Sequence, residues 1–303
     1  MISNALSVDL EEYFQVSNFE KLLDRERWGS LPTRVEASTH RLLDAFDETG
    51  SRATFFVLGW VAERHPALVR QIAARGHEIA CHGFDHELLY EIGPERFRSD
   101  LRRACAAIAE ASGCTPLGYR APSYSVTEQS LWALDILAEE GFRYDSSIFP
   151  IRHHRYGIPS FEKQPLRLSL PSGAQIDEFP MSTLKIAGLT VPMAGGAYLR
   201  FMPKALFRWG FGRLVGQGVP TVLYLHPWEI DPDQPRQAVG LKVRVNHYFN
   251  LHRTEARLRG LLETFNFAPL GAVLADLESA GRLPIRSLSE VSERLPRGAL
   301  AAA

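Results

Sequence analysis

Two histidines, His82 and His86, stand four residues apart in the segment His82-Gly83-Phe84-Asp85-His86. This spacing brings two imidazoles together on one helical turn, and imidazole is the commonest protein ligand for zinc and similar ions. Histidines at this spacing also occur by chance on protein surfaces, so the pair alone leaves metal binding open. His77 precedes a candidate strand, and we expect it to be structural.

Two carboxylates, Asp9 and Glu11, follow the first apolar run of the chain. Residues two apart in a strand project from the same face, so these side chains can share one site if the strand continues. The alternative is a solvated acidic strand end.

Two further polar side chains occur at candidate strand ends. His226 follows a hydrophobic run and could be a third metal ligand, a general acid or base, or a core residue. Arg120 precedes Ala121-Pro122, and its guanidinium could hold a carboxylate through two hydrogen bonds. The alternative for Arg120 is a surface position before a turn.

Together these residues provide the parts of a hydrolytic site. Two histidines and one carboxylate, with water completing the shell, make a catalytic zinc-type site, and Glu11, His82 and His86 supply that set. Asp9 then remains free to accept a proton from water, and His226 to protonate a leaving group. Metal, base and acid together predict hydrolysis of an amide or ester.

The elements that would position these side chains follow a βα pattern, which predicts an α/β fold around a mainly parallel sheet. In such folds, functional groups lie at the carboxyl ends of the strands. Six prolines punctuate the region from about 145 to 200 and predict hairpins or long loops there. The candidate strands are 5–9, 53–59, 77–81, 117–120 and 220–226, and the candidate helices are 34–49, 61–75, 95–112, 127–140 and 253–264.

Composition narrows the class of partner. The chain of 303 residues has 34 basic and 35 acidic residues, a formal net charge of -1, so no bulk charge favours nucleic acid or an anionic membrane surface. We expect no nucleic-acid partner. Three cysteines without a C-x-x-C pair suit a reducing compartment. Without a signal-peptide pattern or a transmembrane segment of about 18 apolar residues, we expect a cytoplasmic protein.

Taken in order, these residues resemble the polysaccharide deacetylases with a NodB homology domain, carbohydrate esterase family four. In that family an acidic motif contains the catalytic base and a metal-binding carboxylate, which Asp9 and Glu11 resemble. The family motif H-[ST]-x-x-H is matched by His82–His86, and R-x-P by Arg120-Ala121-Pro122. A late strand that ends near a histidine, the family's general acid, is matched by Leu225-His226.

Two longer segments, 7–15 and 224–232, resemble the exosortase-associated (PEP-CTERM system) subgroup, whose genes accompany exopolysaccharide synthesis. The resemblance implies a single catalytic domain over 1–303, with a subgroup-specific C-terminal portion at 230–290 packed on the barrel. The implied fold is a distorted (β/α) barrel with a loop- and hairpin-rich insertion around 145–200.

The implied activity is metal-dependent removal of N-acetyl groups from amino sugars of a poly- or oligosaccharide. Glu11, His82 and His86 would bind one divalent ion, zinc by preference, with cobalt or nickel as alternatives. Arg120 would orient Asp9 as the base, and His226 would be the acid.

Substrate contacts are expected from Ser123, whose backbone N–H could stabilise an oxyanion, and from Tyr124 and Trp228. An open groove for a polymer would need exposed aromatic side chains. The available residues are Tyr13, Phe14, Tyr124, Trp228 and Tyr248.

The sequence departs from the family pattern in several places. Leu10 separates Asp9 from the next carboxylates, so the metal ligand could be Glu11 or Glu12, and the shared strand face favours Glu11. Gly83 replaces the usual Ser or Thr between the histidines. The carboxylate partner of the acid has candidates in Asp177–Pro180.

Two alternatives remain open at this point. One is a same-family amide hydrolase with a non-sugar N-acyl or ureide substrate, which would enclose its pocket. The other is an inactive sugar-binding homologue, although such a protein would have no need of a spare base and acid.

Overall fold

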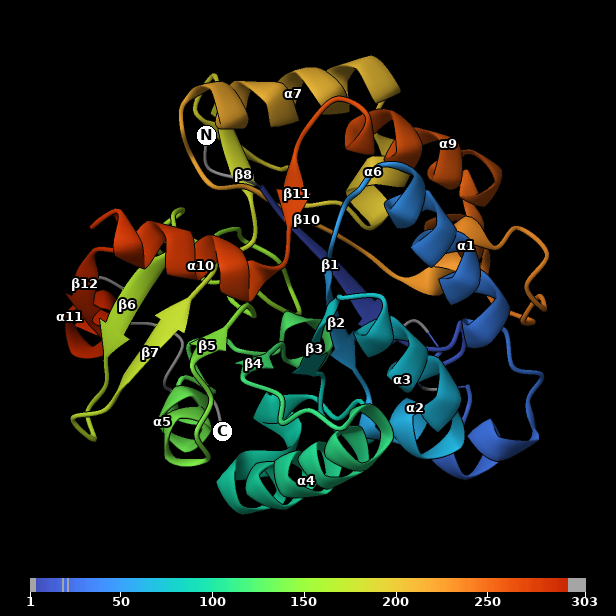
Figure 1. The fold of residues 1–303 in the computed structure, drawn as a ribbon, viewed down its shortest axis with the longest axis horizontal. Coiled ribbons are helices and arrows are strands. Elements are labelled where there is room, and N and C mark those ends of the chain that lie inside the picture. The colour runs from blue at the N-terminus through green and yellow to red at the C-terminus, as the bar shows by residue number, and fades with distance from the viewer. Residues whose placement is uncertain (1–3, 18, 21, 294–303) are drawn as a thin grey trace.

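The computed structural model describes residues 4–17, 19–20 and 22–293, in which strands and helices alternate along the chain. The two ends of the domain expected over 1–303 lie outside these residues. Figure 1 shows the helices arranged around a central group of strands. This arrangement confirms the α/β class.

Within the described residues, the main sheet has the order β10-β1-β2-β3-β4-β5-β7-β6-β12, and β11 also pairs with β1. Neighbours are parallel except for the antiparallel pair β6 and β7. The strands are β1 Asn4–Leu10, β2 Thr54–Val57, β3 Glu78–Cys81, β4 Gly118–Tyr119, β5 Tyr144–Asp145, β6 Leu166–Ser169, β7 Gln175–Glu178, β10 Val222–Leu225, β11 Phe267–Ala268 and β12 Ile285–Ser287. A separate hairpin pairs β8 Thr183–Ile186 with β9 Leu189–Pro192.

Helices surround this sheet, and three short 3-10 helices follow strands or loops near its edge. The α-helices are α1 Val35–Glu48, α2 Gly59–Arg64, α3 Pro66–Ala74, α4 Leu89–Ser112, α5 Trp132–Glu139, α6 Ala197–Phe201, α7 Lys204–Gly216, α8 Leu241–Tyr248, α9 Leu251–Leu262, α10 Leu270–Ser279 and α11 Leu288–Glu293. The 3-10 helices are η1 Arg25–Ser30, η2 Pro122–Tyr124 and η3 Pro227–Ile230. No helix among the residues described is both long and apolar enough to cross a bilayer.

The first strand separates two buried layers. Leu6, Val8 and Leu10 belong to the core between the sheet and its covering helices. Ala5 belongs to a second core, on the other side of the sheet, with Phe56 and Tyr224. Because side chains alternate along a strand, Asp9 shares the face of Ala5 and points into the barrel.

The expected hairpins in 145–200 are confirmed, as β6–β7 within the main sheet and β8–β9 outside it. The helix expected over 61–75 is wrong as a single element, since it is broken between α2 and α3. Pro66 has no N–H to donate and disfavours helical backbone at the preceding His65, which has φ -126° and ψ 51°. The helix expected over 127–140 begins only at Trp132, and α7 was not expected.

Gly118 in β4 permits a close approach that positions the following Arg120. A Cβ at Gly118 would lie 2.1 Å from the ring of Tyr144, which is buried in β5. We therefore expect Gly118→Ala to lower the free energy of unfolding by about 1–3 kcal/mol, measured by urea denaturation. Gly216→Ala is the matched control, because it has open space and a helical position and should stabilise by about 0.5–1 kcal/mol. Equal unfolding midpoints for the two variants would contradict this packing.

Candidate metal centre

Four strand ends deliver the polar residues singled out in the sequence. Parallel pairing places Val8 opposite Leu225, and Cys81 opposite Tyr119. The residues that directly follow the ends of β1, β3, β4 and β10 therefore come to one edge of the sheet, namely Glu11, His82, Arg120 and His226.

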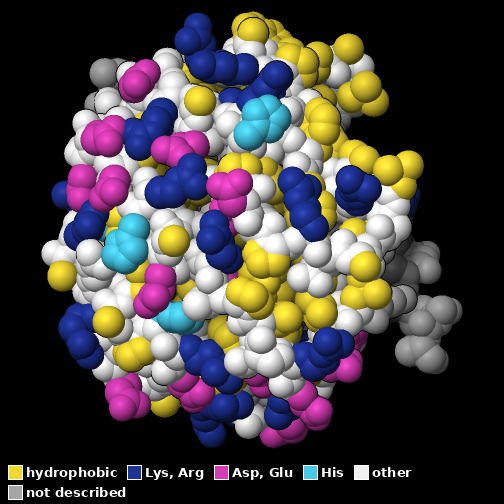
Figure 2. Space-filling model, turned by 90° about the vertical axis from the view of Figure 1, so that its right-hand side faces the viewer, with side chains coloured by type: hydrophobic (Ala, Val, Ile, Leu, Met, Phe, Trp, Pro, Cys, Tyr) yellow, Lys and Arg dark blue, Asp and Glu magenta, His cyan; other side chains and the backbone are white. Residues whose placement is uncertain are grey.

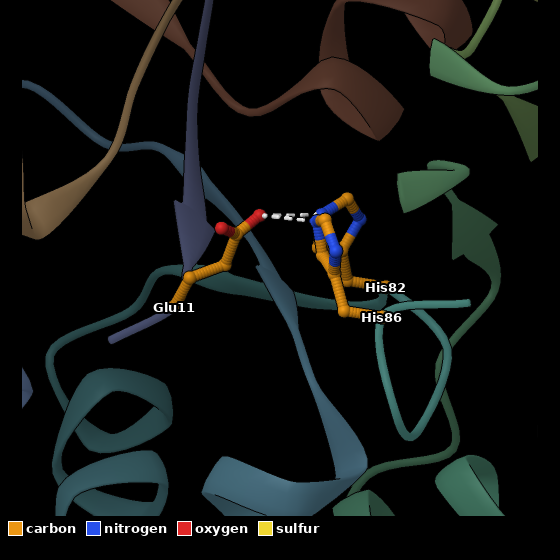
Figure 3. A group of neighbouring side chains, drawn as sticks. All are labelled: Glu11, His82 and His86. Carbon is orange, nitrogen blue, oxygen red and sulfur yellow. Dashed lines mark hydrogen bonds and ion pairs between the residues drawn. The ribbon is translucent and has the colours of Figure 1, made fainter. Parts of the chain in front are cut away.

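Two imidazoles point at one carboxylate oxygen. His82 Nε2 lies 2.9 Å and His86 Nε2 3.3 Å from Glu11 Oε1 (Figure 3). All three side chains are buried, and their candidate ligand atoms lie within 4.8 Å of one another. The structure thus brings together the three residues that the sequence analysis assigned to metal binding.

The donor set fits a divalent cation. His82 Nδ1 lies 2.7 Å from the carbonyl oxygen of Arg120, which can only accept, so Nδ1 carries the proton. In the neutral imidazole, Nε2 then presents a lone pair to the Glu11 carboxylate, so two acceptors face each other. A bound cation resolves this conflict, and a backbone carbonyl behind the ligand is the usual support of a metal-binding histidine.

The surrounding histidines also favour the ionised form of Glu11. Burial by itself raises the pKa of this carboxyl group. In the metal-free chain, the charges of His86 and His226, and the hydrogen bonds that His82 and His86 donate in their protonated forms, outweigh burial. The pKa of Glu11 therefore lies well below its ordinary value. An ionised carboxylate is the form that binds a metal ion.

Asp9 is held by a fully buried arginine. Arg120 Nη1 donates to Asp9 Oδ1 at 2.7 Å and to Ser7 Oγ at 2.8 Å. Its Nε and Nη2 donate to the carbonyl and hydroxyl oxygens of Ser146, each at 3.0 Å. These contacts fix the orientation of the Asp9 carboxylate beside Glu11.

His226 lies close to both Asp9 and Glu11. Its Nε2 lies 3.9 Å from Asp9 Oδ2 and 3.8 Å from Glu11 Oε1. Burial lowers the pKa of His226, but Glu11, Glu229 and Asp9 outweigh burial and raise the pKa to about 9. In the chain without a metal ion, His226 is therefore protonated at neutral pH.

Sequence reasoning missed the partner of His226. Glu229 Oε2 accepts from His226 Nδ1 at 3.0 Å, and Glu229 Oε1 accepts from Arg200 Nε at 2.7 Å. Burial raises the pKa of Glu229, yet Arg200 and His226 together lower it to about 2. Glu229 follows His226 by three residues, in the turn after β10. This spacing is the sequence signal that could have identified Glu229 as the partner.

The segment Asp177–Pro180 does not supply that carboxylate. Asp177 is instead paired with Arg167 through two hydrogen bonds of 2.7 and 3.0 Å. Glu178 accepts from the backbone N–H of Ile148 at 3.1 Å. Both carboxylates are used within the β5–β7 part of the sheet.

The aromatic side chains expected to line an open groove are buried instead. Trp228 is 6% exposed and stacks between His226 and His247, with ring centroids 5.1 and 4.3 Å away. Tyr124 is buried in the barrel core. The other three, Tyr13, Phe14 and Tyr248, share a hydrophobic cluster with Trp228. These buried rings therefore pack within the protein and do not form an exposed platform. Phe14 also lines the hollow that His86 reaches.

Gly83 and Asp100 explain one departure from the family pattern. Gly83 has φ 76°, and a Cβ there would lie 3.0 Å from Asp100 Oδ2. Asp100 accepts from the backbone N–H groups of Phe84 at 2.8 Å and Asp85 at 3.3 Å. Asp100 lies on the apolar face of α4 between Phe97 and Leu101. A carboxylate among apolar residues was the sequence signal that could have predicted this supporting role.

Glu12 has a different place from Glu11. Its carboxylate accepts from the backbone N–H groups of Arg34 and Val35 at the start of α1, and from Thr33 Oγ1. Three donors at a helix start satisfy this buried group. Glu11, and not Glu12, lies beside the two histidines.

Unusual backbone conformations gather at the site. His86, Ser123 and Tyr124 have φ of 53°, 51° and 58°, which is the left-handed region that L-residues rarely adopt. The Ser123 hydroxyl contacts that of Ser17, which ties this turn to the segment after β1. Such strain concentrates where a fixed geometry is needed.

Two hollows share Glu20, and the smaller one reaches the site. One, of about 460 Å³, is lined by His86, Trp28 and Asp24 among others. The other, of about 1010 Å³, is lined by Ser17, Tyr156 and residues around them. The candidate metal centre therefore adjoins an open hollow through His86 and does not lie inside an enclosed pocket.

Residues 29–144 match the polysaccharide deacetylase family, and residues 146–275 match a domain of unknown function, DUF3473. A peptidoglycan deacetylase-like protein from Gibberella zeae is 33% identical over 111 residues, 36% of this chain and 32% of that protein. A peptidoglycan-N-acetylglucosamine deacetylase from Bacillus cereus is 31% identical over 98 residues, 32% of this chain and 36% of that protein. The matched region spans about a third of the length of these curated relatives.

The fold is similar to a structure described as a candidate polysaccharide deacetylase from Mycobacterium smegmatis, with a TM-score of 0.56 and 22% identity. The similarity covers 97% of this chain and 89% of that one. The distorted (β/α) barrel expected from the sequence is confirmed.

The two neighbouring glutamates allow a direct test of the metal set. We expect Glu11→Gln to weaken zinc binding by about 100-fold or more, because it removes a charged ligand, whereas Glu12→Gln should keep zinc binding. Isothermal titration of the metal-free protein with zinc measures both. Glu12→Gln should instead lower the free energy of unfolding by about 1–3 kcal/mol, because buried helix-start donors lose a charged acceptor. Loss of zinc binding in Glu12→Gln alone would reverse the assignment.

Proposed function

We propose that this protein is a metal-dependent hydrolase that removes N-acetyl groups from amino sugars of a poly- or oligosaccharide. The match of residues 29–144 to the polysaccharide deacetylase family supports this proposal. The observation that carries the proposal is the convergence of His82 and His86 on the buried Glu11 carboxylate, with a second carboxylate and a third histidine beside it. Zinc is the proposed ion, and cobalt or nickel suit the same ligands.

A divalent ion held by Glu11, His82 and His86 would lower the pKa of a bound water and polarise the acetyl carbonyl. Asp9 is the proposed base. Its carboxylate is kept in place by Arg120 at 2.7 Å, and it accepts the proton that water loses as the oxygen bonds to the acetyl carbon. The backbone N–H of Ser123 is the proposed donor to the developing oxyanion.

His226 is the proposed acid. It gives a proton to the sugar nitrogen as the carbon–nitrogen bond breaks, so that acetate and a free amine leave. Glu229 and Arg200 act through His226, because they hold its Nδ1 proton and orient its ring. They are positioning residues.

The two open hollows support an extended substrate over an enclosed small N-acyl compound or ureide. The smaller hollow is lined by His86 of the candidate metal set, and it shares Glu20 with the larger hollow. A chain of several sugars can therefore extend from the metal centre through the smaller hollow toward the larger one. The larger hollow is lined by Tyr156, His153 and His154, whose polar ring atoms can hydrogen-bond to a sugar.

We further propose that the natural role is in exopolysaccharide synthesis. The support is the resemblance of 7–15 and 224–232 to the exosortase-associated subgroup. In the structure both segments lie at the metal centre, since they contain Glu11 and His226.

The activity is tested by acetate release from N-acetylglucosamine oligomers and from peptidoglycan, with protein-bound metal quantified in the same samples. We expect release by the zinc-loaded protein and none after chelation. Asp9→Asn should keep the metal but lose at least about 100-fold in turnover, because the base is removed. Metal bound without any release from either glycan would contradict the substrate class, and release that survives chelation would contradict metal dependence.

The positioning role of Glu229 predicts a shift in pH dependence. Removing its negative charge by Glu229→Gln lowers the pKa of His226, so the acid loses its proton at lower pH. We expect the alkaline limb of the kcat/KM profile to move down by about one pH unit, with zinc still bound. Asp233→Asn, an exposed carboxylate in the loop after η3, is the control and should leave the profile in place. A lower kcat with an unmoved alkaline limb would show a purely structural role.

A further inference from the structure

An exposed apolar ridge runs from α8 to α6 and consists of Leu241, Val245, Phe249 and Phe201. Their exposed fractions are 76%, 45%, 42% and 42%. Leu241 and Val245 lie one turn apart on α8, and Phe249 follows at the same spacing just after the helix. The ring of Phe249 stacks on that of Phe201 at 4.8 Å, so the four side chains form one continuous surface.

The ridge is held in place from below. His247 and Tyr248 at the end of α8 are buried. Arg200, next to Phe201, donates through Nη1 to the carbonyl oxygens of His247 at 3.0 Å and Phe249 at 3.2 Å. The apolar side chains are therefore presented to solvent by a firmly bonded part of the fold.

The chain segments that carry the ridge contain basic residues and no acidic ones. No aspartate or glutamate occurs in 179–228 or in 234–254, although the whole chain has a net charge of only -1. Exposed cations lie within four residues of ridge residues, namely Lys204, Lys242, Arg244 and Arg253. Figure 2 shows hydrophobic side chains gathered toward the upper right of one face, with Lys and Arg side chains beside them.

We propose that the ridge docks this protein on the surface of an anionic lipid bilayer. Aliphatic and aromatic side chains enter the headgroup boundary while the surrounding cations contact lipid phosphates, which is the chemistry of interfacial membrane binding. A second copy of the chain fits less well, since a symmetric contact would place the basic flank of one copy against that of the other.

Docking would bring the larger of the two hollows close to the lipid surface. Val243, between Leu241 and Val245 on α8, lines the larger of the two hollows. A glycan anchored in the same bilayer would therefore meet the open side of this hollow. Access of a membrane-anchored glycan rests on the proposed function. Membrane docking itself is measured as vesicle binding, which does not depend on enzyme activity.

The test is flotation of the full chain with vesicles of phosphatidylcholine alone or mixed with phosphatidylglycerol. We expect binding to the mixed vesicles, weakened by added salt. Leu241→Ser with Val245→Ser should weaken binding about tenfold or more. Lys242→Gln with Arg244→Gln should weaken it about thirtyfold, since each cation near an anionic surface contributes about a fivefold factor.

Matched controls carry the same changes elsewhere on the surface. Leu189→Ser alters an equally exposed leucine in β9, and Arg27→Gln with Arg70→Gln removes two exposed cations, and both should bind like the unchanged chain. Absence of binding, equal binding to both vesicle types, or full binding by the ridge variants would overturn the proposal. A dimer in sedimentation that the ridge variants lose, without vesicle binding, would also overturn it and assign the ridge to self-association.

Discussion

Arg120 connects the two halves of the site, because its side chain and its backbone serve different partners. The guanidinium has no exposed surface and is balanced by Asp9 at 2.7 Å, while the carbonyl oxygen of the same residue accepts from His82 Nδ1. An unpaired charge at this depth would be strongly destabilising, so the ion pair constrains β1 and β4 together. The orientation of the proposed base and the tautomer of a proposed metal ligand are thereby set by one residue at one strand end.

Acidic and basic side chains alternate around the Arg120–Asp9 ion pair. Glu11 is surrounded by three imidazoles, and His226 lies between Glu11 and Asp9 on one side and Glu229 on the other. Glu229 is in turn paired with Arg200. Each buried charge therefore has an opposite neighbour, which lets the chain hold several ionisable groups in a small volume with low exposure. The proposed base and the proposed acid are therefore held in place by charged partners within the protein.

Sequence patterns were most informative where chemistry and strand ends coincide. The short, largely apolar runs before Glu11, His82, Arg120 and His226 placed these residues at one edge, because parallel strands align their ends. The supporting groups were harder to predict. Asp100 and Arg200 are separated in sequence by more than a dozen residues from the groups to which they hydrogen-bond. No local sequence pattern encodes such a contact. The buried aromatic residues were misassigned because sequence alone does not distinguish a ring that covers a loop from one that lines a groove.

The position of β1 in the sheet also constrains how the chain can fold. This strand pairs with β2 on one side, but its other neighbours, β10 and β11, come more than 200 residues later. During synthesis on the ribosome, Glu11, His82 and His86 emerge long before the strand that brings His226. Contacts of such high contact order form late, and until then β1 keeps an open parallel edge. Incompletely synthesised chains therefore expose an aggregation-prone strand edge of the kind that molecular chaperones shield, even after the candidate metal ligands have emerged.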